Sequence, residues 1–248
     1  MKRLNTLLIA FSLVSLCSFA QSAKRVTVDY NAATNQAWHK IEQWKANATN
    51  PIQFFPADTT RAKFTLFRAD FDINSTLAAF AFNSGGMIVD GGWLRVLGSG
   101  CDKFNRGLIE WNKGKSVAGN DTVKYFLVAD DVVGGFFALY LTPHTRFENA
   151  YVFYQGPNDR RWVSTGLKYE DFLQFCFAGE IKMFYNNYRW EGWKKEIHMI
   201  NSNQTISCYP EFWMEGARDT KLKRRVIPVQ KCWDLYNPKV EGRSTSVK

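Results

Sequence analysis

Three pairs of short apolar segments, each joined by a few turn-forming residues, constrain the fold of this chain more than any other feature. Segments 87–89 and 93–97 are separated by Asp90-Gly91-Gly92, and glycine accepts the positive φ that a tight hairpin turn needs. Segments 124–129 and 136–141, and then 150–154 and 161–163, repeat the pattern. Connections this short join antiparallel neighbours, because a parallel crossover needs a dozen or more residues. The pattern therefore predicts an antiparallel meander.

A helical pattern precedes the predicted strands. Apolar residues fall on one face of a helix that we expect over residues 35–48, with Thr34 or Asn35 as its N-cap. A second, weaker helix is expected over residues 59–67.

Helical spacing returns after the strands. Apolar residues recur at helical positions over 169–176, with Gly179 ending the segment, and again over 181–188 and 193–200. Helix, meander and then helices is the order of an α+β protein, with an antiparallel sheet flanked by an N-terminal helix and C-terminal helices. No Pro/Gly/Ser-rich linker divides residues 21–248, so we expect a single domain.

The first twenty residues resemble a secretory signal peptide. Lys2 and Arg3 precede a mostly apolar stretch, and small residues near Ala20 suit a cleavage site. We therefore expect residues 1–20 to be removed and the protein to be exported, as a periplasmic or secreted protein. A buried N-terminal helix and a lipoprotein attached through Cys17 are the alternatives, but Leu16 is larger than the residue that usually precedes a lipid-attachment cysteine.

Removal of the signal would leave four cysteines, an even number that permits up to two disulfides in an exported chain. Cys176 lies in an apolar stretch and is expected to act as a small core residue. Cys208 with Cys232 is the pair that we favour, and Cys101 has no predicted partner. The sequence contains no CxxC, so neither a zinc ribbon nor a thioredoxin-like motif is supported.

The formal net charge of +9 is unevenly distributed. From about residue 218 to the end, nine basic residues outnumber three acidic ones, which leaves the rest of the mature chain nearly neutral. This distribution argues against a nucleic-acid-binding core. The cationic end predicts at most a weak contact with an anionic surface, through Lys221, Lys223, Arg224 and Arg225.

Most catalytic signatures are incomplete. Gly114-Lys115-Ser116 lacks the first glycine of a phosphate-binding loop, and the glycines of Gly98-Ser99-Gly100 are too close for a nucleophile elbow. The three histidines, His39, His144 and His198, have no metal-ligand spacing. We predict no metal and no cofactor. His144 or His198 within hydrogen-bond reach of a carboxylate or Cys101 in a cleft is the remaining route to a hydrolase.

Two segments admit both a structural and a functional interpretation. Asp130-Asp131 could cap a turn, bind a cation or supply a general base; turn chemistry is favoured, because adjacent residues on a strand point to opposite faces. The aromatic and basic residues 188–195 could stack on sugars or bases, or could fill the core while their cations reach water. Core packing is favoured, because large aromatic side chains are mostly buried.

Several long segments resemble the bacterial family known as domain of unknown function 2625. They are 37–41, 85–100, 111–112, 126–139 and 189–193, and together they span roughly residues 31–234. The resemblance supplies no enzyme activity, because the family has none assigned that can be carried over to this chain. The chain also has a fainter likeness to the SUKH superfamily. This likeness rests on the succession of strands around the acid–glycine turn at residues 130–135 and on a closing helix that begins at Tyr169. It implies an α+β binding surface for a toxin or another protein, although an export signal conflicts with neutralising a cytoplasmic toxin.

Together these features predict an exported, non-catalytic binding module for a protein or envelope partner. A hydrolase acting on an envelope component and an immunity-like protein that binds a toxin are the alternatives. The resemblance and the placement at sheet turns select the candidate binding residues, which are Asp90, Trp93, Arg95, Asp130, Asp131, Gly134 and Gly135.

Overall fold

The computed structural model describes residues 29–69, 71–115, 124–158, 160–211, 214 and 223–238. The signal peptide expected over residues 1–20, the lipid-attachment alternative at Cys17 and the basic residue Lys221 lie outside these ranges. Within them, every helix is too short or too polar to cross a membrane.

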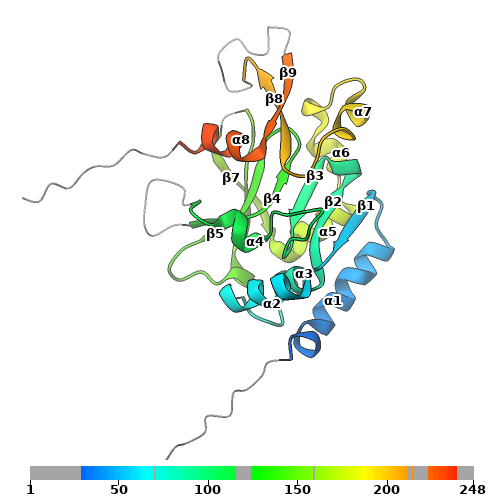
Figure 1. Ribbon diagram of the computed structural model, residues 1–248, viewed down its shortest axis with the longest axis vertical. Coiled ribbons are helices and arrows are strands. Elements are labelled where there is room, and N and C mark those ends of the chain that lie inside the picture. The colour runs from blue at the N-terminus through cyan, green and yellow to red at the C-terminus, as the bar shows by residue number, and fades with distance from the viewer. Residues whose placement is uncertain are drawn as a thin grey trace, which may run out of the picture.

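A seven-stranded antiparallel sheet forms the centre of the fold (Figure 1). Its strands are hydrogen-bonded in chain order, which confirms the predicted meander. Strand β1, not predicted, adds one edge to the six expected strands by pairing with β2. The strands are β1 (Ile52–Pro56), β2 (Ser84–Val89), β3 (Leu94–Leu97), β4 (Lys124–Asp131), β5 (Phe136–Leu141), β6 (Tyr151–Gln155) and β7 (Trp162–Lys168).

Helix α1 (Tyr30–Ala46) confirms the first predicted helix but begins earlier than expected. The predicted caps Thr34 and Asn35 are wrong, because both lie inside the helix. Asp29 is the N-cap, and its carboxylate accepts hydrogen bonds from two backbone N–H groups of the first turn, at 3.1 and 3.2 Å. The cap satisfies donors that have no intrahelical partner, so the helix extends back to it.

Two further helices lie between β1 and β2. Helix α2 (Thr59–Arg68) agrees with the helix predicted over 59–67. Helix α3 (Thr76–Asn83) was not predicted, because it is buried all round from Thr76 to Phe82 and so lacks an amphipathic period.

The helices after the sheet confirm the predicted order but are shorter than expected. Helix α5 (Tyr169–Ala178) ends at Gly179 as predicted. The segment expected to form one helix over 181–188 divides into α6 (Ile181–Phe184) and the 3₁₀ helix η3 (Asn186–Tyr188). Helix α7 (Trp193–Ile197) stops before the predicted end at residue 200.

A separate two-stranded hairpin, not predicted, lies at the opposite end of the molecule from α1 (Figure 1). Its strands β8 (Gln204–Tyr209) and β9 (Lys223–Pro228) pair antiparallel, and α8 (Val229–Tyr236) packs beside them. The remaining short elements are η1 (Asp90–Gly92), α4 (Leu108–Asn112) and η2 (Phe147–Asn149). The hairpin brings residues near 202–205 against the ends of β3 and β4, where most predicted site residues lie.

Candidate functional site

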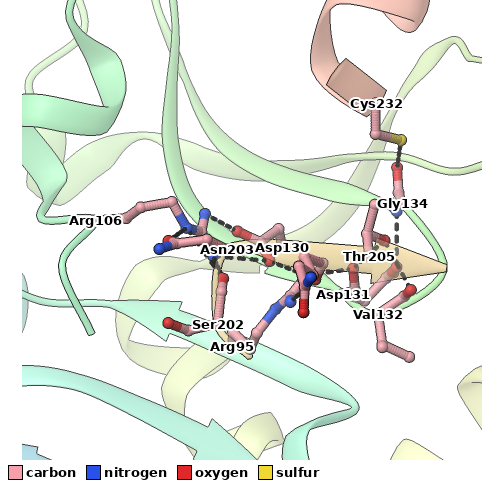
Figure 2. A network of polar contacts seen from close by, with 12 residues as sticks. Arg95, Arg106, Asp130, Asp131, Val132, Gly134, Ser202, Asn203, Thr205 and Cys232 are labelled. Atoms are coloured by element: carbon pink, nitrogen blue, oxygen red, sulfur yellow. Dashed lines mark hydrogen bonds and ion pairs between the residues drawn. The ribbon is translucent and has the colours of Figure 1, made fainter. Parts of the chain in front are cut away.

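A fully buried carboxylate, Asp130, lies near the end of β4 between two arginines (Figure 2). Arg95 is its cross-strand neighbour on β3, and Arg95 Nη2 lies 2.5 Å from Asp130 Oδ1. Arg106 comes from the loop before α4, and its Nη1 lies 2.5 Å from Asp130 Oδ2. Each carboxylate oxygen therefore has its own guanidinium, which compensates for removing the charge from water.

The same two arginines join the sheet to the segment that leads into β8. Arg106 Nη2 donates to the Ser202 carbonyl at 2.5 Å, and Arg106 Nε donates to Asn203 Oδ1 at 3.2 Å. Arg95 Nη1 donates to the Gln204 carbonyl. The ion-pair network thus attaches the small hairpin to the central sheet.

Arg106 is a site residue that sequence reasoning missed. It is buried, and its guanidinium lies over the Trp111 ring, 4.7 Å from the centroid. Burial lowers the pKa of Arg106 from its ordinary value, while the charge of Asp130 opposes that shift. No local signal marks this residue, because its partner Asp130 is 24 positions away in the chain.

Asp131, next to Asp130, points to the other side of the sheet and closes the turn between β4 and β5. Its Oδ1 accepts from the backbone N–H groups of Val133 (3.0 Å) and Gly135 (2.7 Å), and its Oδ2 accepts from the Tyr154 hydroxyl (2.8 Å). Burial raises the pKa of Asp131, and the hydrogen bonds from Gly135 and Tyr154 act against the shift. The two carboxylates have separate partners and do not form a shared-proton pair. The predicted turn chemistry describes Asp131 but is wrong for Asp130, whose carboxylate is bound by Arg95 and Arg106.

The two glycines of this turn are required by close packing. Gly134 has φ +90°, and a Cβ there would lie 2.6 Å from Cys232 Sγ. A Cβ at Gly135 would lie 2.3 Å from both Asp131 Oδ2 and the Tyr154 hydroxyl oxygen. Both predicted positions are therefore sites where only glycine fits without rearrangement.

The disulfide predicted between Cys208 and Cys232 is absent: both cysteines are free and buried, as are Cys101 and Cys176. Cys208 lies opposite Arg224 in the β8–β9 register, whereas Cys232 Sγ contacts the Gly134 carbonyl oxygen at 3.7 Å. The two thiols thus belong to different packing environments. Burial raises the pKa of Cys208 to about 11 and that of Cys232 to about 12, so neither is an activated nucleophile.

The first predicted turn contains a second ion pair. Asp90, which has a positive φ of 51°, pairs with Arg189 from the loop after η3. The Arg189 guanidinium lies 5.0 Å from the centroid of the Trp93 ring and 4.6 Å from that of Trp193. Trp93 is fully buried, and its indole meets Trp193 edge-on at 4.9 Å. The aromatic and basic segment 188–195 therefore packs on the core, as favoured, with its arginine stacked on indoles.

The described part of the predicted cationic patch is partly neutralised. Arg224 pairs with Glu196 at 3.0 Å and stacks over Trp190, whose indole N–H donates to the same carboxylate. Arg225 lies 3.8 Å from Glu211, and Lys223 is exposed. The hydrogen bond from Arg224 is the main cause that lowers the pKa of Glu196.

The three histidines are exposed. His39 contacts Glu42 on the outer face of α1, and among the described residues neither His144 nor His198 contacts a carboxylate or Cys101. Across the described ranges, no three His, Cys, Asp or Glu side chains are arranged to hold a metal ion. The contact of His144 or His198 with a carboxylate or Cys101, which would have favoured a hydrolase, is thus not found among the described residues.

Cavities open at several places on the described part of the molecule, and three of them are considered for a binding role. One of about 380 Å³ lies between the N-terminal ends of α3 and α5 and is lined largely by charged and polar residues. A second, of about 260 Å³, touches the predicted site residue Arg95 and the neighbouring turn residues Gly91 and Gly92. The third, also about 260 Å³, is apolar and lies between β7 and helices α5 and α6. The predicted residues Trp93, Asp130 and Asp131 are buried, so their proposed binding role has no direct access from solvent.

The fold and the site define an α+β protein built on a seven-stranded meander, with a buried arginine–aspartate network at one end. Residues 29–232 match the family described as "Protein of unknown function DUF2625", and the chain belongs to this family. It is 29% identical over 201 residues to the "Putative uncharacterized protein YbfG" of Escherichia coli K12, a match that covers 81% of this chain and 90% of YbfG. It is 33% identical over 196 residues to an "Uncharacterized protein" of Haemophilus influenzae, covering 77% of this chain and 85% of the relative.

Proposed function

We propose that this chain is a non-catalytic binding module that holds an apolar segment of a partner protein in the groove between β7 and helices α5 and α6. One observation carries the proposal: an open cavity of about 260 Å³ in which aromatic and aliphatic side chains predominate. Its apolar lining includes Phe137, Tyr154, Val163, Phe172, Phe175 and Phe184.

Exposed apolar side chains continue the groove onto the surface. Val163 is 57% exposed and Phe184 is 37% exposed although both line the cavity, and the neighbouring Met183 is 73% exposed. Covering such side chains is favourable by about 25 cal/mol per Å² of apolar surface removed from water. A contiguous apolar surface of this kind is typical of an interaction site.

The polar groups of the groove favour a protein segment over a polar small molecule. The Tyr154 hydroxyl donates to Asp131, and Thr165 Oγ1 donates to the Val152 carbonyl, so both are already engaged. Strand β7 is the outer strand, but Gly166 has φ +75° and the β6–β7 register is irregular, which interrupts pairing with a further strand. Contact through apolar side chains is therefore favoured over strand addition.

Site-specific photo-crosslinking tests this proposal. A photoreactive amino acid placed at Val163 should crosslink one protein partner in the native cell, and the crosslink should disappear with Phe184→Ser. The matched control is the same amino acid at Val226, which is also an exposed strand valine, on β9. Equal crosslinking at both positions, or a crosslink at Val163 that Phe184→Ser leaves intact, contradicts the proposal.

Export is part of the same proposal, and the signal-like residues 1–20 support it. We expect the mature protein in the periplasm or the medium, beginning close after Ala20. Fractionation followed by N-terminal sequencing tests this. An uncleaved chain in the cytoplasm contradicts it.

The SUKH-like relationship remains a proposal, supported by the succession of β4, its acid–glycine turn, β5, β6, β7 and α5. It would make the partner a toxin. Co-expression with a toxin encoded beside this gene should then protect the cell, and the Val163→Asp variant should lose that protection. A toxin neighbour that kills equally with and without the chain contradicts it.

A further inference from the structure

A second cavity lies between the central sheet and residues 197–202, separate from the groove at β7. Its volume is about 260 Å³, and it touches the first predicted turn through Gly91 and Gly92. A Cβ at either glycine would meet nothing within 4 Å, so both glycines border open space.

Arg95 lines this cavity with one unused hydrogen-bond donor. Its Nη1 donates to the Gln204 carbonyl, and its Nη2 is engaged by Asp130 and by the Asp131 carbonyl at 2.9 Å. Arg95 Nε is buried and has no hydrogen-bond partner in the described part of the chain. A buried donor without a partner is costly, so an acceptor is expected at this position.

The charge around the cavity favours an anion. Arg95 and Arg106 share the single carboxylate of Asp130, and the positively charged residue Lys103 also lines the cavity. Among the described residues Lys103 takes part in no ion pair, and it is exposed at the surface. His198 also lines the cavity, and no described carboxylate does.

Apolar side chains supply about half of the lining, and Asn201 and Ser202 add polar groups. Phe55 and Ile88 come from β1 and β2, Val132 comes from the β4–β5 turn, and Ile197 and Ile200 come from the covering segment. An inorganic anion would leave these side chains unused, whereas a short hydrocarbon chain would cover them.

We propose that this cavity binds a small carboxylate that carries a short apolar group. The carboxylate accepts a hydrogen bond from Arg95 Nε and is balanced by Lys103, and the apolar group packs against Phe55, Ile88 and Ile200. The proposal is independent of the groove at β7, because the two cavities share no lining residue.

NMR titration of the ¹⁵N-labelled chain tests the proposal, with sodium butanoate as the probe at low ionic strength. We expect saturable shifts of the Gly91 and Gly92 amide signals. Butanamide keeps the shape but lacks the charge, and inorganic phosphate keeps the charge but lacks the apolar group. Each should bind about tenfold more weakly, because each loses one of the two interactions.

Variants separate this site from general charge effects. Lys103→Gln should weaken butanoate binding about fivefold, as expected for an ion pair at the surface. Lys63→Gln, an exposed lysine on α2, is the matched control and should have no effect. Ile200→Ala should weaken butanoate binding and leave acetate binding unchanged. Arg95 is not replaced, because its loss would also unpair Asp130.

Three results would overturn the proposal. The same shifts with butanoate and with butanamide would mean that charge has no role. Equal butanoate binding by the Lys103 and Lys63 variants would place the effect outside the cavity. Absence of saturable shifts at Gly91 and Gly92 across the millimolar range would leave water as the only acceptor for Arg95 Nε.

Discussion

Two turns of this protein combine acidic residues with glycines, and each joins a pair of neighbouring strands. They are Asp90-Gly91-Gly92 and residues 130–135, and they differ in their surroundings. Asp90 pairs with Arg189 near the surface, and the space beside Gly91 and Gly92 is open. Asp130 and Asp131 are fully buried, and the corresponding space beside Gly135 is filled by Asp131 and Tyr154. The two turns are alike in composition, but the space around their glycines is filled in one and open in the other.

The difference arises because β8 and α8 cover only the second turn. The Val132 carbonyl accepts from the backbone N–H of Ile206 and from Thr205 Oγ1, both at 2.7 Å, and Cys232 packs against Gly134 (Figure 2). The first turn instead borders a cavity. An acid–glycine segment can close a turn by itself, but the elements packed on it decide how much stability it contributes.

Removing the central carboxylate should have the largest effect. Asp130→Asn leaves the buried arginines Arg95 and Arg106 without a compensating charge, and we expect a loss of about 3–5 kcal/mol in the free energy of unfolding. Asp90→Asn should cost about 1–2 kcal/mol, because its one arginine partner is closer to solvent. Urea denaturation measures both. Equal losses would mean that burial does not distinguish the two turns.

Replacing glycine with alanine should distinguish the two turns by a smaller difference in the free energy of unfolding. Gly135→Ala forces Asp131 and Tyr154 apart, and we expect a loss of about 3 kcal/mol. Gly91→Ala has open space around it and should cost about 1 kcal/mol, the strain of a left-handed backbone. Thermal unfolding of the two variants provides the comparison. A larger loss at Gly91 would contradict the packing described at Gly135.

The pH dependence of stability should reveal the burial of Asp131. Its pKa is raised in the folded state, so the folded protein retains this proton to a higher pH than the unfolded chain does. The stabilisation that this group contributes is therefore fully present below a pH of about 4, and it is lost as the pH rises through the pKa of the folded state. Asp131→Asn lacks this dependence, so the stability of the wild type relative to the variant should decrease with rising pH.

A control with the opposite sign is available at the surface. The pKa of Glu196 is lowered, mainly by its hydrogen bond with Arg224, so its contribution is present at neutral pH and falls as pH decreases through the folded pKa. The stability of the wild type relative to Glu196→Gln should therefore fall on acidification. If the stability of the wild type relative to each variant changed in the same direction with pH, burial would not be the dominant cause of the pKa shift at Asp131.

Adding a reductant should have the smallest effect on the stability of the protein. Because Cys232 packs against the second turn as a free thiol, adding a reductant should leave the melting temperature unchanged. A thiol count on the denatured protein should be the same with and without prior reduction. A higher count after reduction would indicate a disulfide and would reopen the pairing predicted between Cys208 and Cys232.

Much of the fold follows from local patterns. The three hairpin signals and the apolar spacing of α1, α2 and α5 are each contained within a short stretch of sequence, so they predict the meander and its flanking helices. The missed elements lack such a pattern. Helix α3 is apolar on every side, and β8 and β9 form a hairpin whose paired strands are separated by residues 210–222.

Less of the candidate site could be predicted, because its contacts join distant parts of the chain. Asp90, Arg95, Asp130 and Asp131 were selected as turn and strand-end residues, but their partners were not. Arg189 is 99 residues from Asp90, and the Gln204 carbonyl that Arg95 contacts is 109 residues away. The two cavities that carry the binding proposals are likewise lined by segments that only the fold brings together.

By itself, the sequence determined the class of the fold and the chemistry of its turns, since paired apolar segments, helical spacing and glycine conformation act within a few residues. Only the tertiary structure decided which carboxylates are buried, which arginines compensate them and which apolar side chains remain exposed. The physical reason is that burial and charge pairing depend on what lies across the interior. That arrangement is set by packing among elements that are distant in the chain.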